Sequence, residues 1–398
     1  MRKARREETE EKAKKRKKLK SFSKQDILAK IKLDNKTKLT ILGLVIVIII
    51  WVLIANYTTF GLVLNKKITS KDAVQVELAN SNNVVLPFLD KVLIQSENTI
   101  TCYSKLGNKE WEIKLEDMVN AKIATSGKYI QVINKDKNLV YVFKNKYEVA
   151  RIKLEGKIYS GSINSNGDSV IEYNSNGTKT ALAIYNNSGK IKYNVKLSNK
   201  IIGKYILSDN SRYLAYIDVN IDGISANTNV NVIDLKNISE DKTNYKTAYT
   251  IENSLAYDIY WINSKLVIRT EDENVIYNAS NEKRSDFEIG SKAIVEIQND
   301  NKNFVYTYID GSGNYKLDIA RMGKEKIKII ELNEEAKHLL YENGISYVCY
   351  NKKIEAYNNF GMKIKEYDSD IVITKPVVFN NGKSIAMTIS NKLIMFTL

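Results

Sequence analysis

The chain has 398 residues, 43% of them hydrophobic, and a formal net charge of +15 at pH 7. Residues 1–38 carry 16 Lys and Arg against 6 Asp and Glu, so +10 of that excess lies in this tail and +5 in the other 360 residues. Because the charge is concentrated in a tail rather than spread over a folded face, nucleic-acid binding is not expected.

The basic tail, residues 1–38, allows two interpretations. Its first part is the charge block RKARREETEEKAKKRKKLK, and its second part, SFSKQDILAKIKL, can place Phe22, Ile27, Leu28 and Ile31 on one face of a short helix. Such a segment can lie on anionic lipid, where each Lys or Arg contributes about 1 kcal/mol. Alternatively, the tail is disordered and only sets the orientation of the chain in the membrane.

Residues 39–64 are predicted to be a transmembrane helix and its flank. From Leu39 to Ala55, thirteen of seventeen residues are Leu, Ile or Val and none is charged. The alternative is a cleaved signal peptide, but the apolar run is longer than is usual for one and no clear cleavage site follows it. Since the basic residues precede the span, the N-terminus is predicted to be cytoplasmic and residues 65–398 to lie outside the cytoplasm, anchored to the cell membrane.

The region after residue 65 repeats one pattern of turn and strand. The stretches IATSGKYIQVI, INSNGDSVIEY, LSDNSRYLAYI, IQNDNKNFVYT and VFNNGKSIAMT align at their turn residues, Gly127, Gly167, Ser211, Asn301 and Gly382. These positions are 40, 44, 90 and 81 residues apart, so one degenerate copy is expected in each double gap. The copies WINSKLVIRT and LYENGISYVCY fill those gaps.

Each repeat unit reads as four strands joined by hairpins, which is typical of a propeller blade. Residues 65–398 are therefore predicted to form an all-β, eight-bladed propeller of four-stranded antiparallel blades, with seven blades as the alternative count. The last unit has only three strands, and we expect the N-terminal strand KDAVQVEL, Lys71 to Leu78, to supply the fourth and close the ring. The expected units begin near Val84, Ala121, Ile158, Ile201, Leu255, Ala293, Lys337 and Ile371.

The repeat, h-x-x-[N/D/S]-[G/S/N]-[K/R/D]-x-h-x-h, resembles those of bacterial WD40-like, TolB-like and PQQ-like propellers. With the basic tail and one span, the chain is similar to an uncharacterised family of membrane-anchored propeller proteins from clostridia-like Gram-positive bacteria. The resemblance implies the fold and the anchor but no activity. The tryptophan-docking motifs of PQQ enzymes and the WD dipeptide are absent from the sequence, so neither quinone chemistry nor a eukaryotic WD40 role is implied.

One loop resembles the opening of a calcium site. In DVNIDGISANTN, Asp218, Asn220 and Asp222 precede Gly223 in the order D-x-N-x-D-G, which can wrap oxygen ligands around a hard cation. Position twelve is Asn229 rather than the bidentate acid that would complete the shell. Calcium is thus a candidate ligand here, with a polar hairpin as the alternative, and no other cofactor is expected.

Aromatic side chains suggest one contact surface. Tyr257, Tyr260 and Trp261 fall in a predicted inner strand and its turn, and Tyr and Trp are common interface anchors. They are also ordinary strand formers and core residues, which is the favoured interpretation, with the contact surface as the alternative.

The sequence contains little that points to catalysis. His338 is the single histidine, the two cysteines Cys102 and Cys349 are far apart, and there is no G-x-S-x-G elbow, so no enzymatic function is predicted. The predicted function is a protein-binding platform in the bacterial cell envelope, with envelope proteins and membrane lipid as partners. The alternatives are a sensor that binds a ligand and signals through the tail, and an envelope hydrolase.

Overall fold

The computed structural model divides the chain into two compact units, residues 1–62 and 63–398. The residues it describes are 40, 43–47, 64–79, 83–115, 121–175, 177–197, 200–220, 227–238, 245–251, 255–270, 274–284, 293–300, 302–322 and 326–398. In the first unit, residues 43–47 are helical. Within the described ranges no helix is long and apolar enough to cross a membrane. The predicted tail, 1–38, and most of the predicted span, 39–64, lie outside these ranges and stay predictions.

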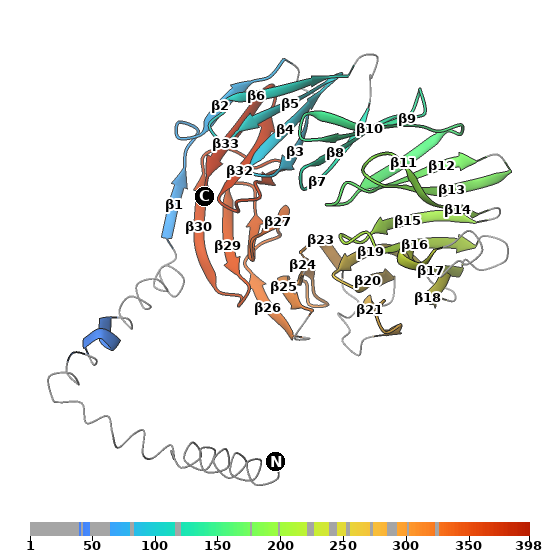
Figure 1. Ribbon diagram of the computed structural model, residues 1–398. Coiled ribbons are helices and arrows are strands. Elements are labelled where there is room, and N and C mark those ends of the chain that lie inside the picture. Colours follow the sequence, from blue (N-terminus) through green and yellow to red (C-terminus); the bar gives the residue numbers. More distant parts are fainter. Residues whose placement is uncertain are drawn as a thin grey trace, which may run out of the picture. The chain divides into compact units, whose positions relative to one another are not determined.

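Residues 63–398 form an all-β propeller of eight blades, and Figure 1 shows the sheets arranged around a common centre. Blade 1 contains β3 (Asn83–Phe88), β4 (Lys91–Ser96), β5 (Thr99–Ser104) and β6 (Lys109–Lys114), and blade 2 contains β7 (Lys122–Ser126), β8 (Tyr129–Asn134), β9 (Leu139–Lys144) and β10 (Tyr147–Lys153). Blade 3 contains β11 (Ile158–Ile163), β12 (Ser169–Ser175), β13 (Thr178–Tyr185) and β14 (Ile191–Leu197). Blade 4 contains β15 (Ile201–Leu207), β16 (Tyr213–Asn220), β17 (Asn227–Asp234), the short 3₁₀ turn η1 (Leu235–Asn237) and β18 (Tyr245–Ile251).

The second half of the ring repeats the same order. Blade 5 contains β19 (Ala256–Ile262), β20 (Lys265–Thr270), β21 (Asn274–Asn278) and β22 (Lys283–Arg284), and blade 6 contains β23 (Ala293–Asn299), β24 (Asn303–Ile309), β25 (Tyr315–Arg321) and β26 (Lys326–Leu332). Blade 7 contains β27 (His338–Glu342), β28 (Ile345–Cys349), β29 (Lys353–Asn358) and β30 (Lys363–Ser369), and blade 8 contains β31 (Val377–Val378), β32 (Ser384–Ile389) and β33 (Lys392–Thr397). The predicted repeat boundaries therefore match the blades, and eight rather than seven is the count.

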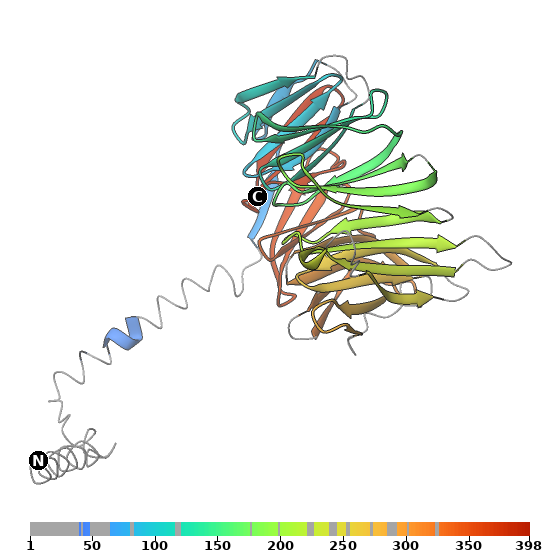
Figure 2. The same ribbon diagram turned by 45° about the vertical axis from the view of Figure 1, so that its right-hand side comes forward.

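The blades pack face to face, as Figure 2 shows for the green and yellow sheets. A central strand such as β8 is buried at all six positions, whereas the outer strand β10 alternates exposed and buried residues at its end. Central strands are apolar on both sides because each side meets a neighbouring blade. The hydrophobic core is accordingly divided into layers between blades, for example the layer in which Ile133 and Val140 of blade 2 meet Ile158 and Ile171 of blade 3.

The repeated turn residues adopt the left-handed backbone conformation. Gly167 has φ 84° and Ser211 has φ 59°, and Gly127 and Gly382 behave in the same way. Only glycine, asparagine and a few other residues take this conformation cheaply, which explains why small polar residues recur there. The fifth turn residue, Asn301, lies outside the described residues.

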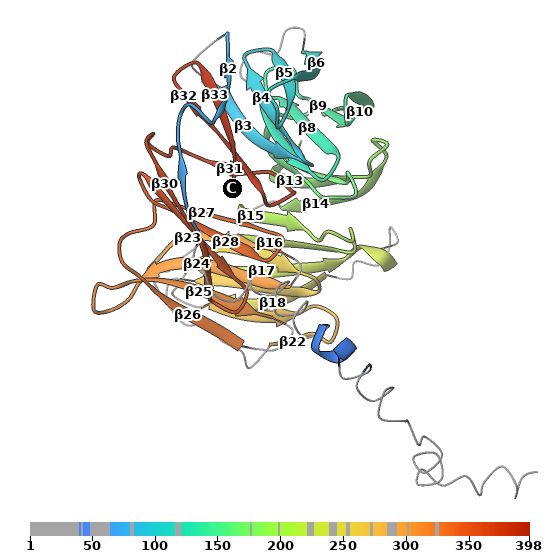
Figure 3. The same ribbon diagram turned by 90° about the vertical axis from the view of Figure 1, so that its left-hand side faces the viewer.

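Two N-terminal strands join the last two blades. β2 (Val74–Glu77) pairs antiparallel with β33, so the segment expected to complete blade 8 does pair there, as Figure 3 shows. β1 (Leu64–Ile68) pairs with β30 as a fifth strand of blade 7, and this pairing is parallel. Sequence periodicity did not predict β1, because its LNKKI sequence lacks an alternating pattern.

Blade 7 contains a buried carboxylate with four partners. Glu355 on β29 is 1% exposed, and its Oε2 accepts hydrogen bonds from the hydroxyls of Tyr350 (2.9 Å) and Tyr357 (2.7 Å). Its Oε1 lies 3.1 Å from Lys363 Nζ and 3.3 Å from Lys353 Nζ. Burial alone would raise the pKa of Glu355, but the hydrogen bonds from Tyr357, Lys363 and Tyr350 outweigh burial and hold the pKa below its ordinary value.

We predict that Glu355→Gln lowers the free energy of unfolding by about 1.5–3 kcal/mol at pH 7, because hydrogen bonds to a charged group are lost. A carboxylate with a depressed folded pKa stabilises above its unfolded pKa of about 4.3, and that contribution disappears as the pH falls through the folded value. Chemical denaturation of wild type and variant between pH 7 and pH 3 measures both effects. The difference between them should shrink toward pH 3.

The matched control is Glu366→Gln, which removes a more exposed carboxylate that also pairs with Lys363. It should cost below about 1 kcal/mol. A similar loss in both variants, or a Glu355→Gln effect that is independent of pH, would contradict this account.

Candidate functional site

The first strand of each blade lies next to the central channel. β3, β7, β11, β15 and β19 contact one another in this order, as do β23, β27 and β31, and β31 contacts β3 again. All of these strands occupy the same place in their repeat and run in the same direction, so their first residues lie at the same end of the channel. We call that end the channel mouth. The hairpins that join the first and second strands of each blade lie at the opposite end, which we call the hairpin end.

Four consecutive blades carry a β-bulge at the channel mouth. The pairing with the second strand skips between Ile158 and Ser160 in β11, and between Ile202 and Tyr205 in β15. It skips again between Ala256 and Asp258 in β19, and between Ile294 and Glu296 in β23. Bulges re-aim side chains and are frequent next to functional sites.

The bulges leave five residues out of the pairing with the second strand, Tyr159, Gly203, Lys204, Tyr257 and Val295. The four that carry a side chain are Tyr159, Lys204, Tyr257 and Val295. Tyr257 is 48% exposed and Val295 42% exposed, Lys204 is exposed, and Tyr159 is half-buried. We call these four residues the bulged arc.

Three further apolar side chains are exposed at the same end of the ring. They are Val84 near the start of β3, Ile201 at the start of β15, and Val372 in the segment that leads to β31, with exposed fractions of 48%, 46% and 47%. These three residues lie in blades 1, 4 and 8 and add to the apolar area of Tyr257 and Val295 at the mouth. Other large apolar residues, Leu106, Tyr147, Ile191 and Phe360, are exposed at the hairpin end.

Lysines gather at the mouth between blades 2 and 3. Lys122 starts β7, Lys135 follows β8 and Lys157 precedes β11. Burial lowers the pKa of Lys135, and the like charges of Lys122 and Lys157 lower it further, while Glu172 opposes them. The three lysines give this sector of the mouth positive charge, which Glu172 partly offsets.

Polar contacts fix the inner strands at the mouth. Lys204 Nζ lies 3.2 Å from Asp258, which also accepts a hydrogen bond from the Tyr260 hydroxyl. The Arg269 guanidinium stacks 4.6 Å from the ring centre of Tyr257 and donates to its hydroxyl at 2.8 Å. Two residues of the bulged arc, Lys204 and Tyr257, are therefore held by polar contacts with blade 5.

The structure separates the three aromatic residues of the predicted contact surface. Tyr257 belongs to the exposed arc. Tyr260 is half-buried beside Phe304 (5.6 Å between ring centres), and burial followed by Asp258 raises the pKa of its hydroxyl. Trp261 is 8% exposed, stacks on Tyr213 and donates to the carbonyl oxygen of Ile206. The contact role stays a prediction, and among the three it concerns Tyr257.

Of the predicted calcium ligands, Asp218 is the one whose side chain the structure describes. Its carboxylate is buried within blade 4 and accepts hydrogen bonds from Lys200 (2.9 Å), Asn229 (3.0 Å) and Asn231. Asp222 and the side chain of Asn220 lie outside the described part of the chain. In the described part, no three His, Cys, Asp or Glu side chains are grouped as a metal site would need. The calcium site stays a prediction.

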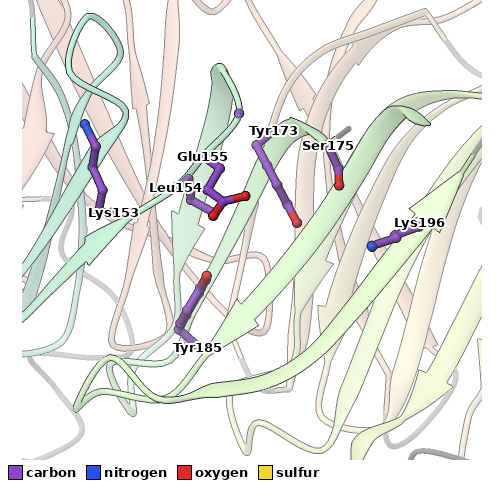
Figure 4. Close-up of a pocket in the computed structure, with 8 residues that line it drawn as sticks. Lys153, Leu154, Glu155, Tyr173, Ser175, Tyr185 and Lys196 are labelled. Carbon is purple, nitrogen blue, oxygen red and sulfur yellow. The ribbon is translucent and has the colours of Figure 1, made fainter. Parts of the chain in front are cut away.

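A pocket of about 340 Å³ opens between blades 2 and 3 (Figure 4). Figure 4 shows Tyr173, Tyr185 and Glu155 pointing toward one another, with Lys196 at one side. The Tyr173 hydroxyl accepts a hydrogen bond from Asn194 at 2.7 Å, and burial, with Tyr173 nearby, raises the pKa of Tyr185. The pocket offers hydroxyl groups and charges of both signs.

Sequence reasoning missed the bulged arc and the lysine sector. A bulge arises from the pairing of two strands, and the bulged positions of the four inner strands have no residue type in common that would reveal it in the sequence. The lysine sector could have been found from the basic residues that flank β7, β8 and β11 in the blade template.

The family model that matches this chain is described as a family of unknown function, DUF5711, and it covers residues 64–397. The chain belongs to the DUF5711 family. The match spans the whole propeller. No curated protein is similar enough to count as a relative.

Solved structures resemble this DUF5711 chain in fold alone. The WD40 domain of SCAP from fission yeast has a TM-score of 0.51 at 10% identity, over 82% of this chain and 98% of that one. Sqt1 from Saccharomyces cerevisiae has a TM-score of 0.52 at 9% identity, over 84% and 99%. The chain also spans 33% of the tricorn protease, with 73% of its own length matched, 11% identity and a TM-score of 0.47.

We predict that Gly156→Ala destabilises the ring by about 3 kcal/mol, because overpacked backbone must shift to make room. A Cβ at Gly156, which lines the pocket of Figure 4, would lie 1.4 Å from the carbonyl oxygen of Asn174. Gly203→Ala is the control, since its Cβ would meet nothing closer than Ile217 at 3.6 Å. Thermal and urea unfolding compare the two, and equal stabilities would show that the pocket wall is not tightly packed.

Proposed function

We propose that this protein is a single-pass membrane protein whose propeller lies outside the cytoplasm and binds envelope proteins through the channel mouth. The observation that carries the proposal is the bulged arc, in which four consecutive blades present unpaired residues at the same end of the channel. The apolar run Leu39 to Ala55 and the preceding basic residues support the anchor and its orientation. An anchor raises the effective concentration of the ring for partners at the same membrane.

The mouth suits a protein segment with acidic and apolar side chains. Lys122, Lys135 and Lys157 complement acids, while Tyr257 of blade 5 and Val295 of blade 6 offer apolar contact area. Arg269 is already stacked on Tyr257, so the aromatic ring needs little further ordering on binding. Aromatic and arginine side chains in such positions commonly dominate binding energy.

We predict that the double variant Tyr257→Ser, Val295→Ser binds the partner at least tenfold more weakly, because each lost apolar contact is worth on the order of 1–3 kcal/mol. The partner is captured by cross-linking and mass spectrometry on intact cells that produce the full-length protein. Partner yield is then compared between wild type and variant.

The matched control is Ile329→Ser, which removes an exposed apolar residue from β26, the outermost strand of blade 6. It should leave cross-linking unchanged. Equal yields of cross-linked partner from wild type, the double variant and Ile329→Ser would refute the mouth as the binding surface. If cross-links to proteins were confined to the tail and a small ligand stabilised the ring, the results would favour the alternative function, a ligand-binding sensor.

The ring must be closed to hold the mouth in shape, and we propose that pairing of β2 with β33 closes it. Leu393 and Met395 of β33 are buried, and β33 lies between β2 and β32.

We predict that deletion of residues 392–398 lowers the stability of every blade, because an open ring exposes the apolar faces of blades 1 and 8. Hydrogen exchange measured by mass spectrometry tests this prediction. Faster exchange throughout blades 1 to 8 is expected. If faster exchange is confined to β2, β31 and β32, then β33 completes the sheet of blade 8 without closing the ring.

A further inference from the structure

The most exposed apolar side chains of the propeller lie at the hairpin end. Among the large apolar residues that the structure describes after residue 63, Leu106, Phe360 and Tyr147 have the highest exposed fractions, 67%, 67% and 65%, and Ile191 is 49% exposed. All four lie at the hairpin between the third and fourth strands of a blade, in blades 1, 7, 2 and 3. We call them the apolar tips. A single exposed apolar residue is ordinary, but the same position exposed in three consecutive blades indicates a shared role.

Polar contacts fix the turns that carry two of the tips. The backbone amide of Leu106 donates to Ser104 Oγ at 3.3 Å. In blade 7, Asn358 Oδ1 accepts hydrogen bonds from the backbone amides of Phe360 (3.0 Å) and Met362 (3.1 Å). The turns therefore hold Leu106 and Phe360 at the surface of the ring.

In blades 1 to 3 a lysine directly precedes the apolar tip. These lysines are Lys105, Lys146 and Lys190, and all three are exposed. Lys146 Nζ lies 5.4 Å from the centre of the Tyr147 ring. A basic side chain beside an exposed apolar one is typical of surfaces that lie in the interface of an anionic membrane, where the apolar part is buried and the charge stays at the headgroups.

The acids near these turns already have basic partners. The pairs are Glu110 with Lys91, Glu148 with Arg151, and Asp168 with Lys192. In the described ranges no ion pair involves the lysines that precede the tips. The rim of the hairpin end thus combines exposed apolar side chains with positive charge, and both complement an anionic lipid surface.

The chain also enters the propeller at the hairpin end. Leu64, the first residue of β1, pairs with Lys365 near the start of β30, and β1 runs parallel to β30 along the edge of the ring (Figure 1). The turn that carries Phe360 directly precedes β30. Because the proposed membrane anchor ends at residue 64, a chain that comes from the membrane reaches the ring beside this apolar tip.

We propose that the rim of the hairpin end rests on the anionic lipid surface of the membrane that anchors the chain, with the apolar tips in the interface and the three lysines at the headgroups. A membrane is a plane, so it can touch the tips of separate blades at once. The inference rests on the proposed anchor and not on the protein-binding role of the mouth. It places the mouth at the end that faces away from the membrane, where other envelope proteins can reach it.

The proposal is tested with the full-length protein in vesicles of equal parts phosphatidylglycerol and phosphatidylcholine that contain a spin-labelled lipid as quencher. The fluorescent dye NBD is attached to Leu106→Cys or Phe360→Cys. It reacts selectively, because the native Cys102 and Cys349 are buried and burial raises the pKa of the Cys102 thiol to about 12. An interfacial side chain lies about 5–10 Å into the headgroup boundary, so the nitroxide should quench most of the fluorescence at both tips.

The matched control is Val84→Cys, which places the dye in blade 1, as Leu106→Cys does, but at the channel mouth. Its fluorescence should not be quenched. Absence of quenching at the tips, or equal quenching at Val84→Cys, would overturn the proposal. A dye that is shielded at the tips but not quenched would indicate a protein on the rim, such as a second copy of the chain, and would overturn the assignment to lipid.

The contribution of charge is tested by the triple variant Lys105→Gln, Lys146→Gln, Lys190→Gln. Each lost lysine should weaken the contact of the rim with the anionic surface about fivefold, so quenching at Leu106→Cys should fall. It should fall in the same way when phosphatidylcholine is the only lipid. Quenching that is insensitive to both changes would contradict a role for the lysines.

The control for charge removes three exposed lysines from the opposite ends of the same outermost strands, β6, β10 and β14. These substitutions are Lys114→Gln, Lys153→Gln and Lys196→Gln. Quenching at Leu106→Cys should stay as in the parent protein. An equal fall in the two triple variants would show that only total charge matters and would overturn the assignment to the rim.

Flotation of the same vesicles separates failure of the rim from failure of the anchor. An inserted span holds the full-length protein on vesicles of either lipid composition. Flotation with both compositions but without quenching at the tips would leave the anchor standing and overturn the rim contact. Flotation with neither composition, or with the anionic vesicles alone, would overturn the anchor and, with it, this inference.

Discussion

The central strands of each blade are apolar on both faces, and the rest of the structure depends on this constraint. A strand such as β8, buried along its whole length, needs a neighbouring sheet on each side. A single blade cannot bury both faces of its central strands, because covering each face requires another layer packed against it. The apolar layers between blades, such as the one shared by Ile133 and Ile171, are therefore what stabilises the ring. Polar groups then add specificity, and Glu355 with its four partners is one example.

Sequence reasoning could predict the ring because its signals are local and repeated. Small residues at turns such as Gly167 and Ser211 mark a backbone conformation that few residues adopt, and strand alternation marks the segments between them. The same logic found the β2 segment, since the last unit lacked a strand. β1 escaped because its five residues carry no alternating pattern and pair with a strand about 300 residues away. The sequence left two locations open for Trp261, with the core favoured, and the packing between blades 4 and 5 places it in the core.

The candidate sites depend on features that a single strand does not encode. Tyr257 and Val295 are exposed because the pairing register slips beside them, and the slip depends on two strands at once. A pocket of about 390 Å³ joins the first hairpins of blades 5 and 6, which are adjacent in the ring although about forty residues apart in sequence. The apolar and cationic residues at the mouth likewise come from several blades.

The parallel strand β1 also determines how the ring responds to force. Its pairing with β30 begins at Leu64, and Lys66 donates a hydrogen bond to the Thr397 carbonyl of blade 8. Ser70 then contacts the carboxylate of Asp370 through its backbone amide at 2.9 Å. Tension applied at Leu64 along the strand direction would load these hydrogen bonds together rather than one by one. A pull on β1 from its N-terminal side would therefore be distributed over the last two blades, because β1 pairs with β30 of blade 7 and Lys66 bonds to Thr397 of blade 8.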